Sequence, residues 1–432
     1  MTGRRDGRTR LGHRARRGRR GFATAAAVVL LSSALAACGG DSGTELIWYT
    51  NPDTGGQAKL AEKCSTDDYT ITTQVLPQDA SQQRIQLVRR LAAGDTEIDL
   101  MSLDPPFTAE FAEAGYLADI PDGLEQKLTD QSFEGAVDAA TWEDQMVVAP
   151  FWSNTQVLWY RKSFVEKTDL DVSQPVTWEQ VIRAADENGG KVAVQANKYE
   201  GYAVWINALF EGAGGRLVED VEQGADATVT VDSPAGEDAA RVVEQLASSK
   251  AAPADLSVSN EGTAVATFGS DAGAFMVNWT FVWTAYGDDP VSKDIGFTRY
   301  PRTVEGEESA PPYGGIGLGV NAATESRSEA MSAVECITSP ENQAFYANDS
   351  GNMPASAAGY DDPKLRETYG QDLLDLFQQS VEAAAPRTVS PYWSDISLSL
   401  QSTWHPPSSV DGQTPGQSAD FMSQALQAER LL

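Results

Sequence analysis

The 432-residue chain is strongly acidic, with 62 acidic against 32 basic residues and a formal net charge of −30; a surface of this sign repels phosphate backbones, so nucleic acid is not an expected partner. Only two histidines are present, His13 and His405. So few imidazoles exclude an H-E-x-x-H zinc site and leave any Ser-His-Asp triad dependent on His405, in a proline-marked turn, so we expect no metal, no cofactor and no enzymatic activity.

The amino-terminal segment has the pattern of an export signal. Residues 1–20 contain nine arginines, and the uncharged run GFATAAAVVLLSSALAA follows, too short to span a bilayer comfortably. The run ends in Leu35-Ala36-Ala37-Cys38, which resembles the bacterial lipobox, where the cysteine is diacylated and becomes the first mature residue. We therefore expect a lipoprotein signal peptide at 1–37, a lipidated tether at 38–44, and a protein anchored by lipid on the extracellular or periplasmic face of the cell membrane.

The three cysteines divide naturally between lipidation and pairing. Cys38 could instead be a buried thiol at the start of a domain, but the Gly-Gly-Asp-Ser-Gly that follows it is typical of a tether. If Cys38 carries lipid, Cys64 and Cys336 remain in a compartment where disulfides persist. They are then either a disulfide pair or two separate buried thiols. Loss of the leader removes nine arginines and one aspartate, which takes the net charge from −30 to −38.

The following segments alternate between strand and helix patterns. Thr177 with Gln180 forms a capping box, Ser233 marks another helix start, and either Asp79 or Ser81 caps an earlier helix. Strands are expected at 45–50, 69–77, 98–104, 146–151, 157–161, 192–196, 274–279 and 314–320, and helices at 57–64, 79–94, 107–115, 177–190, 199–215 and 233–249, with several more to the end. Three stretches have the composition of linkers: 39–44, 303–312 and 406–417.

This order of elements predicts an α/β protein with mostly parallel sheets. The 395 residues that follow the leader are too many for one compact core and suit two lobes. In open α/β sheets, ligands bind beyond the carboxyl ends of the strands. Asp104 ends one expected strand, Asn154 follows another and Trp279 ends a third, so position alone makes these three side chains candidates for ligand contact.

Several segments, taken in order, resemble a known family. They are APFWSNTQVLWYRKSF (149–164), TWEQVIRAAD (177–186), FMVNWTFVW (275–283) and YGGIGLGVN (313–321). With the lipobox, they resemble the family 1 extracellular solute-binding proteins of ABC sugar importers, of which maltose-binding protein is the familiar member. Further segments, including LPQDASQQRIQLVRRL, DLMSLDPPFTAEFAEAGY and VAVQANKYEGYAVWINALFEGAGG, are similar to the actinobacterial trehalose-binding lipoproteins.

The resemblance implies a two-lobed periplasmic-binding-protein fold of the maltose-binding type, with a ligand cleft between the lobes. It places the amino-terminal lobe at 45–149 and 317–365 and the carboxyl-terminal lobe at 150–316 and 366–432. Cys64 and Cys336 would then share the amino-terminal lobe, which suits a disulfide. The partners implied are a small sugar and the permease and ATPase subunits of an ABC importer, with the binding protein itself a monomer.

The resemblance also assigns ligand-binding residues. Asp104 matches a carboxylate that accepts bonds from hydroxyls, Trp279 a tryptophan that stacks on a sugar ring, and Arg387 a sugar-contacting arginine, as expected for polar groups beside an apolar wall. The full set of expected ligand-binding residues is Asn51, Asp53, Gln83, Asp104, Asn154, Trp279, Gly315, Arg387 and Trp393, with Tyr392 as an alternative flank of Arg387.

Each of these residues also has a purely structural interpretation. Asp104 could cap a helix, Trp279 could belong to the core, Arg387 could pair with surface acids, and Asn51 and Gly315 could serve the backbone alone. GLGVNA (317–322) loosely matches a nucleotide loop but is better read as a close-packed crossing. Related chains carry an acidic residue where this one has Met276, so another α-linked disaccharide or glycoside is an alternative to trehalose.

Three other functions remain open at this stage. An envelope glycoside hydrolase would need two carboxylates about 5–10 Å apart across the bond, and 61 acidic residues after the leader cannot exclude such a pair. A binder of another solute class, such as a peptide or a polyol phosphate, is the second, although a phosphate site would need clustered cations. The third is an adhesin or scaffold, which would need no closing cleft.

Overall fold

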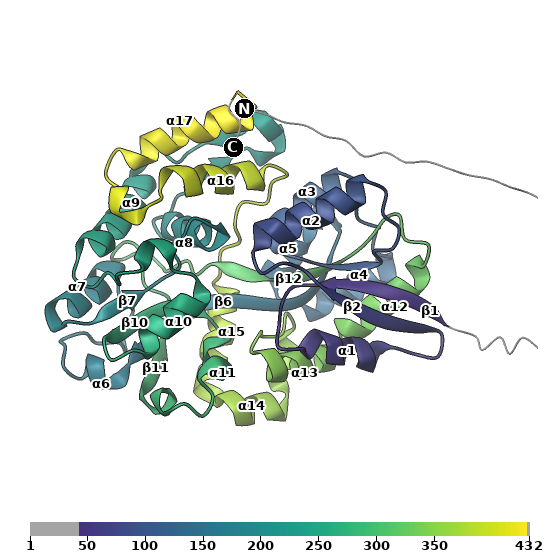
Figure 1. The fold of residues 1–432 in the computed structure, drawn as a ribbon, viewed down its shortest axis with the longest axis horizontal. Coiled ribbons are helices and arrows are strands. Elements are labelled where there is room, and N and C mark those ends of the chain that lie inside the picture. The colour runs from purple at the N-terminus through teal and green to yellow at the C-terminus, as the bar shows by residue number, and fades with distance from the viewer. Residues whose placement is uncertain (1–42, 430–432) are drawn as a thin grey trace, which may run out of the picture. The chain divides into compact units, whose positions relative to one another are not determined.

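The fold is that of a computed structural model, which describes residues 43–429 and is shown in Figure 1. Cys38 and most of the predicted tether lie outside the described residues. Among residues 43–429, no helix combines the length and apolar character needed to cross a membrane.

One mixed sheet runs through both halves of the molecule (Figure 1), in the order β2-β1-β3-β12-β6-β10-β7, with β11 also paired to β6. The strands are β1 (Thr44–Thr50), β2 (Tyr69–Val75), β3 (Leu100–Leu103), β4 (Thr141–Trp142), β5 (Gln145–Met146), β6 (Ala149–Arg161), β7 (Lys191–Ala193), β8 (Val218–Glu219), β9 (Thr228–Val229), β10 (Gly273–Trp279), β11 (Ile295–Thr298) and β12 (Tyr313–Val320). Strand β1 is parallel to β2 and β3, and β10 is parallel to β7. Strands β6 and β12 run antiparallel to their neighbours, so the expectation of mostly parallel sheets was wrong at the centre of the sheet.

Strand β6 is a single strand of 13 residues where the sequence predicted two, at 146–151 and 157–161. The intervening Ser153, Asn154 and Thr155 have the composition of a loop, but all three are buried. Their backbone pairs with β12, and the strand continues against β10 from Gln156 onward. One continuous strand therefore passes from one lobe to the other and places Asn154 at the junction.

Helices cover both faces of the sheet (Figure 1). They are α1 (Gly56–Cys64), α2 (Ala80–Ala92), η1 (Pro105–Phe107), α3 (Thr108–Glu113), α4 (Asp122–Gln131), α5 (Glu134–Ala140), α6 (Lys162–Val165), α7 (Trp178–Asn188), α8 (Glu200–Glu211), η2 (Val221–Asp226), α9 (Pro234–Ser248), η3 (Leu256–Val258), α10 (Glu261–Gly269), α11 (Val282–Tyr286), η4 (Pro290–Asp294), α12 (Arg327–Ile337), α13 (Pro340–Ser350), η5 (Ala357–Asp361), α14 (Pro363–Tyr369), α15 (Gln371–Glu382), α16 (Trp393–Thr403), η6 (Pro407–Ser409) and α17 (Thr414–Leu426).

The helix starts predicted from capping residues are confirmed. Asp79 caps α2 by accepting from the Gln82 backbone N–H, and the Thr177–Gln180 capping box of α7 is formed in both directions. The linker expected at 406–417 was wrong, because this stretch contains η6 and the first turn of α17. Its apolar Val410 is buried, so packing overrides a composition that is typical of a linker.

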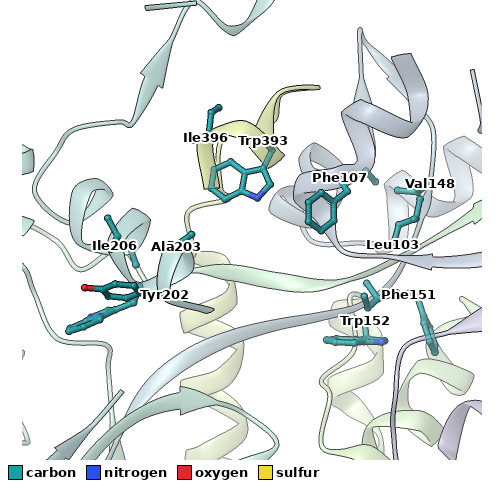
Figure 2. Packing of buried hydrophobic residues seen from close by; sticks show 14 of the residues in the cluster. Leu103, Phe107, Val148, Phe151, Trp152, Tyr202, Ala203, Ile206, Trp393 and Ile396 are labelled. Atoms are coloured by element: carbon teal, nitrogen blue, oxygen red, sulfur yellow. The ribbon is translucent and has the colours of Figure 1, made fainter. Parts of the chain in front are cut away.

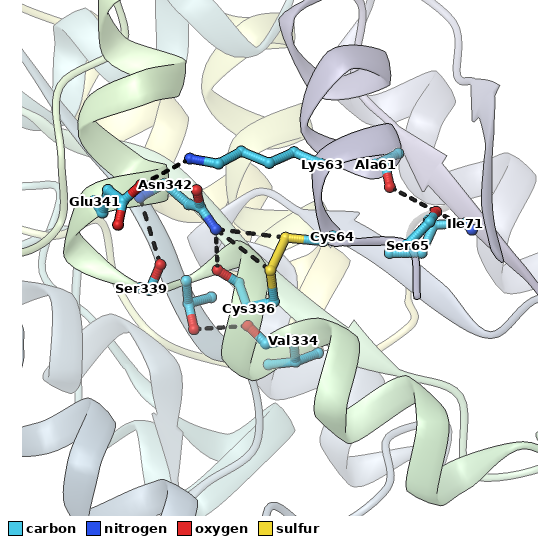
Figure 3. The surroundings of a disulfide bond; sticks show 11 residues. Ala61, Lys63, Cys64, Ser65, Ile71, Val334, Cys336, Ser339, Glu341 and Asn342 are labelled. Carbon is cyan, nitrogen blue, oxygen red and sulfur yellow. Dashed lines mark hydrogen bonds and ion pairs between the residues drawn. A yellow bond between two sulfur atoms is a disulfide. The ribbon is translucent and has the colours of Figure 1, made fainter. Parts of the chain in front are cut away.

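Cys64 and Cys336 form the disulfide that was one of the two possibilities left by the sequence (Figure 3). Cys64 ends α1 and Cys336 lies near the end of α12, 272 residues later. The Asn342 side-chain amide of α13 donates to the Cys336 carbonyl at 2.8 Å and lies 3.3 Å from its Sγ. The disulfide therefore ties α1 to α12, and Asn342 links α13 to the same point.

Glu211, the last residue of α8, is half-buried, and this burial raises the pKa of its carboxyl to about 7, against the attraction of Arg216. A carboxylate at a helix carboxyl end also faces the negative end of the helix dipole. Because the folded pKa exceeds the unfolded value, stability is greatest below about pH 4.5 with respect to this group and falls as the pH rises toward 7.

We expect Glu211→Gln to raise the free energy of unfolding by about 2–3 kcal/mol at pH 8 and by almost nothing at pH 4.5. Urea unfolding at the two pH values measures this difference. The matched control is Glu187→Gln, a change at an exposed position of α7. An equal effect of both substitutions at pH 8 would refute the role of burial at Glu211.

Candidate ligand-binding site

A buried ion-pair network joins the segment after β3 to the segment before α16. The Arg387 guanidinium donates through Nη2 to Asp104 Oδ1 at 2.6 Å and through Nη1 to Glu200 Oε1 at 2.7 Å. The side chains of Arg387 and Glu200 are 4% and 5% exposed, whereas that of Asp104 is 19% exposed. Arg387 therefore pairs with buried acids rather than surface acids, and Asp104 is the member of the network that solvent or a ligand can reach.

Glu200, the first residue of α8, is the centre of this network. Beside Arg387, it accepts from Trp393 Nε1 at 2.9 Å and from Ser397 Oγ at 2.6 Å, both on α16. Gln401 in turn donates to Ser397 Oγ. The guanidinium lies 6.0 Å from the Trp393 ring centre, a geometry that allows a cation–π attraction.

Figure 2 shows how Trp393 of α16 lies between the side chains of α8, represented by Tyr202 and Ile206, and Phe107 of η1. Trp393 is 1% exposed, so its role is to support Arg387 and Glu200 rather than to offer a stacking face. The alternative flank, Tyr392, packs against Gly224 instead.

The contacts of the Asp104 side chain distinguish between a helix cap and a ligand-binding carboxylate. It occupies the N-cap position of η1, but its side chain makes no capping hydrogen bond there. The carboxylate turns to Arg387 instead. Burial raises the pKa of the Asp104 carboxyl above its ordinary value, Arg387 opposes this shift, and Glu200 adds to it. The network therefore sets two carboxyl groups, Asp104 and Glu200, against the single guanidinium of Arg387.

A second group of polar side chains surrounds Asn154 at the middle of β6. Its Oδ1 accepts from Thr280 Oγ1 at 2.7 Å, and its Nδ2 donates to Asn352 Oδ1 at 3.3 Å. Asn352 donates onward to the Tyr346 hydroxyl at 3.3 Å. Thr280 directly follows Trp279, so Asn154 fixes the end of β10 where that tryptophan emerges.

Trp279 lies at the carboxyl end of β10 and is only partly buried. A Cβ placed on Gly314 would lie 2.7 Å from its six-membered ring, so the indole rests directly on the β12 backbone. Its other neighbour is the Glu261 carboxylate, which begins α10. A flat aromatic face beside a carboxylate is a combination that suits a sugar ring with its hydroxyls.

Glu261 and Tyr199 extend this group. Burial raises the pKa of the Glu261 carboxyl, and nearby Asp79 adds to the shift, while Tyr199 and Trp279 oppose it. The Tyr199 hydroxyl is buried and has no hydrogen-bond partner of ordinary geometry among the described residues, although burial and the adjacent Glu261 raise the pKa of its phenol. Asp79 is the N-cap residue of α2, so a segment far from Glu261 in the sequence also lies near this group.

The remaining predicted residues serve mainly the backbone in this structure. Asp53 accepts from the Gly55 and Gln57 N–H groups at the start of α1, and its charge adds to the burial that raises the pKa of Tyr346. Gln83 is buried and donates to the Pro77 carbonyl. Asn51 has a buried Oδ1 for which residues 43–429 provide no hydrogen-bond partner.

Gly315 and Met276 both serve the packing of the sheet and the core. Gly315 has φ 137°, and a Cβ there would lie 2.2 Å from the Trp152 carbonyl, so only glycine allows β12 to approach β6 so closely. Met276 is fully buried in a hydrophobic cluster with Trp159 and Phe268. Its side chain belongs to the core rather than to the groups around Asp104 or Trp279.

Comparison with known proteins agrees with this architecture. Residues 51–344 match the family described as bacterial extracellular solute-binding protein. The chain belongs to this family. Its members are solute-binding proteins rather than enzymes, in agreement with the expectation that the protein is not an enzyme.

Solved solute-binding proteins have the same two-lobed fold. Maltose-bound MalE3 of T. maritima superimposes with a TM-score of 0.79 at 22% identity, covering 90% of this chain and 100% of that one. The GacH receptor of Streptomyces glaucescens, solved unliganded and with acarbose, gives 0.74 at 20% identity, with 89% and 98% covered. UgpB of Mycobacterium tuberculosis, in complex with glycerophosphocholine, gives 0.72 at 16% identity, with 90% and 99% covered.

Three members of the candidate site were not found from the sequence: Glu200, Glu261 and Tyr199. One signal was available for Glu200, which opens the mostly apolar helix α8, because a buried charge requires a paired partner. Glu261 and Tyr199 had no such signal, since each occupies an ordinary helix-start position.

Proposed function

We propose that the protein captures a carbohydrate for an ABC importer, and that the sugar is trehalose or a related α-linked disaccharide or glycoside. The observation that carries this proposal is the pairing of two kinds of group from both lobes. Asp104, Arg387, Glu261 and Asn154 offer charged and amide hydrogen-bonding groups, while Trp279 offers an aromatic face. Sugars need both, because they present hydroxyl pairs and weakly apolar C–H faces.

The charge of the site argues against an anionic solute. Arg387 is the cation of the ion-pair network, and both of its terminal nitrogens are already held by carboxylates. A phosphate ligand would meet the carboxyl groups of Asp79, Asp104 and Glu261, while the guanidinium of Arg387 is already held by two carboxylates. A neutral polyhydroxyl ligand suits this balance better than the glycerophosphodiester bound by UgpB.

The location and partners follow from the same proposal. The lipobox at Cys38 would anchor the protein at the outer face of the membrane, beside the permease and ATPase subunits of its importer. The extracellular description of the family supports that location. Two-lobed binding proteins close around their ligand by hinge motion, so we expect closure to bring Asp104 and Glu261 onto the same sugar.

Calorimetric titration with trehalose, maltose, glucosylglycerol, glucose and glycerophosphocholine is the direct test. We expect an α-linked disaccharide to bind at micromolar or lower concentration and glycerophosphocholine not to bind. Chromatography of the sugar after long incubation should recover it unchanged. Absence of binding to every sugar in the panel would contradict the carbohydrate assignment, and hydrolysis would contradict a purely binding role.

A further inference from the structure

We propose that the tripeptide Tyr199-Glu200-Gly201 at the start of α8 is the positioning element of the binding site. This inference rests on the proposed sugar-binding function. The tripeptide positions two parts of the site at once: a first arm formed by Asp104 and Arg387, and a second arm formed by Tyr199, Glu261 and Trp279. Glu200 fixes Arg387, and Gly201 makes room for Tyr199 beside Glu261. Gly201 has no side chain to offer a ligand, so its role is to position Tyr199 rather than to bind.

The space at Gly201 is filled by the Tyr199 side chain. A Cβ on Gly201 would lie 2.3 Å from Tyr199 Oη, 2.4 Å from Cζ and 2.9 Å from Cε1, all far shorter than van der Waals contact. The phenol ring therefore folds back over the first turn of α8. Because these atoms are the far end of a side chain that can rotate, a methyl group at residue 201 would displace the ring rather than the helix.

The hydroxyl end of the Tyr199 ring reaches the group of site residues around Trp279 and Glu261. The Tyr199 hydroxyl lies next to the Glu261 carboxylate, which also adjoins Trp279. The hydroxyl is buried and lacks a well-formed hydrogen bond among residues 43–429. The Tyr199 ring therefore borders the Glu261 carboxylate, and we infer that it holds this carboxylate in position for a sugar hydroxyl.

The neighbouring Glu200 fixes the other arm through the same helical turn. It is fully paired with Arg387, Trp393 and Ser397, and every residue of α8 from Glu200 to Phe210 is buried. This packing leaves the start of the helix little freedom to move. Because this first turn is rigid, it fixes the distance between the Tyr199 hydroxyl and the Arg387 guanidinium. The separation of the two arms is fixed in the same way.

The first experiment compares Gly201→Ala with Gly123→Ala in the purified protein. Both glycines are the second residue of a helix, but a Cβ on Gly123, in α4, has nothing within 4 Å. Titration with trehalose, and in parallel with maltose, should show at least a tenfold loss of affinity for Gly201→Ala and no change for Gly123→Ala. The melting temperature of Gly123→Ala should equal or exceed that of the wild type, because alanine favours the helix. Gly201→Ala gains the same helix preference but loses the packing of the Tyr199 ring, so it should melt below Gly123→Ala and still unfold cooperatively.

A double-mutant cycle separates positioning from general damage. Tyr199→Ala should lose affinity by a similar factor, and Gly201→Ala added to it should cost less than a further twofold, since the displaced ring is already absent. Additive losses, or a Gly201→Ala variant that binds within twofold of the wild type, would overturn the inference.

A crystal structure of unliganded Gly201→Ala tests the inference without any sugar. We expect the Tyr199 ring to be rotated away from Glu261 while the backbone of α8 is unchanged; an unmoved ring overturns the inference. If the wild-type protein binds neither trehalose nor maltose while the ring moves as expected, the sugar assignment fails and the positioning role stands.

Discussion

Replacing Arg387 by alanine is expected to lower the free energy of unfolding by about 3–5 kcal/mol at pH 7, because it leaves the buried Glu200 and Asp104 carboxylates without their cation. Sugar binding should be lost as well, since the guanidinium holds the Asp104 carboxylate in place. The destabilisation should shrink as the pH falls toward 4.5. With the guanidinium absent, the pKa of the Asp104 carboxyl rises further, and its protonation removes an unpaired charge.

Two further substitutions make this prediction specific. Arg387→Lys keeps the charge but not the two-nitrogen fork that reaches Glu200 and Asp104 together, so we expect partial recovery of stability without recovery of affinity. Arg366→Ala breaks an exposed pair with Asp361 and should cost less than about 1 kcal/mol. Urea unfolding at pH 7 and pH 4.5 and calorimetric titration provide the measurements. Equal losses for Arg387→Ala and Arg366→Ala would contradict the buried network.

Local signals in the sequence predicted most individual elements, because a cap or a period is decided within a few residues. The Asp79 cap and the Thr177–Gln180 capping box depend on one turn of helix and were read directly. The continuity of β6 could not be read in that way. Its polar centre around Asn154 becomes a strand only because β12 and β10, more than a hundred residues later, supply the pairing.

The residues of the candidate site show the same difference between local signals and long-range contacts. Asp104 and Trp279 were selected because each ends a strand, and strand ends are visible in the sequence. That Asp104 binds Arg387 rather than capping η1 depends on a residue 283 positions away. Glu200 and Tyr199 are neighbours in the sequence, yet they serve different arms, because Tyr199 at the N-cap has an extended backbone whereas Glu200 is the first residue of the helix. Such pairings come from tertiary packing and leave no local pattern.

Removing the disulfide with Cys64→Ser and Cys336→Ser is expected to lower the free energy of unfolding by about 2–5 kcal/mol. The two sulfurs close a loop of 272 residues in sequence, so the oxidised unfolded chain is strongly restricted. Sugar affinity should stay within about twofold of the wild type. The cysteines lie at the ends of α1 and α12, and neither contacts the groups around Arg387 or Trp279.

Urea unfolding of the wild type with and without dithiothreitol, beside the double variant, measures this contribution. Dithiothreitol should move the wild type to the stability of the double variant and leave the double variant unchanged. A double variant as stable as the oxidised wild type would mean that native packing alone holds α1 against α12 and α13. The Lys63–Glu341 pair offers that packing one further link, but Glu341 is 83% exposed, so its contribution is too small to replace the covalent bond.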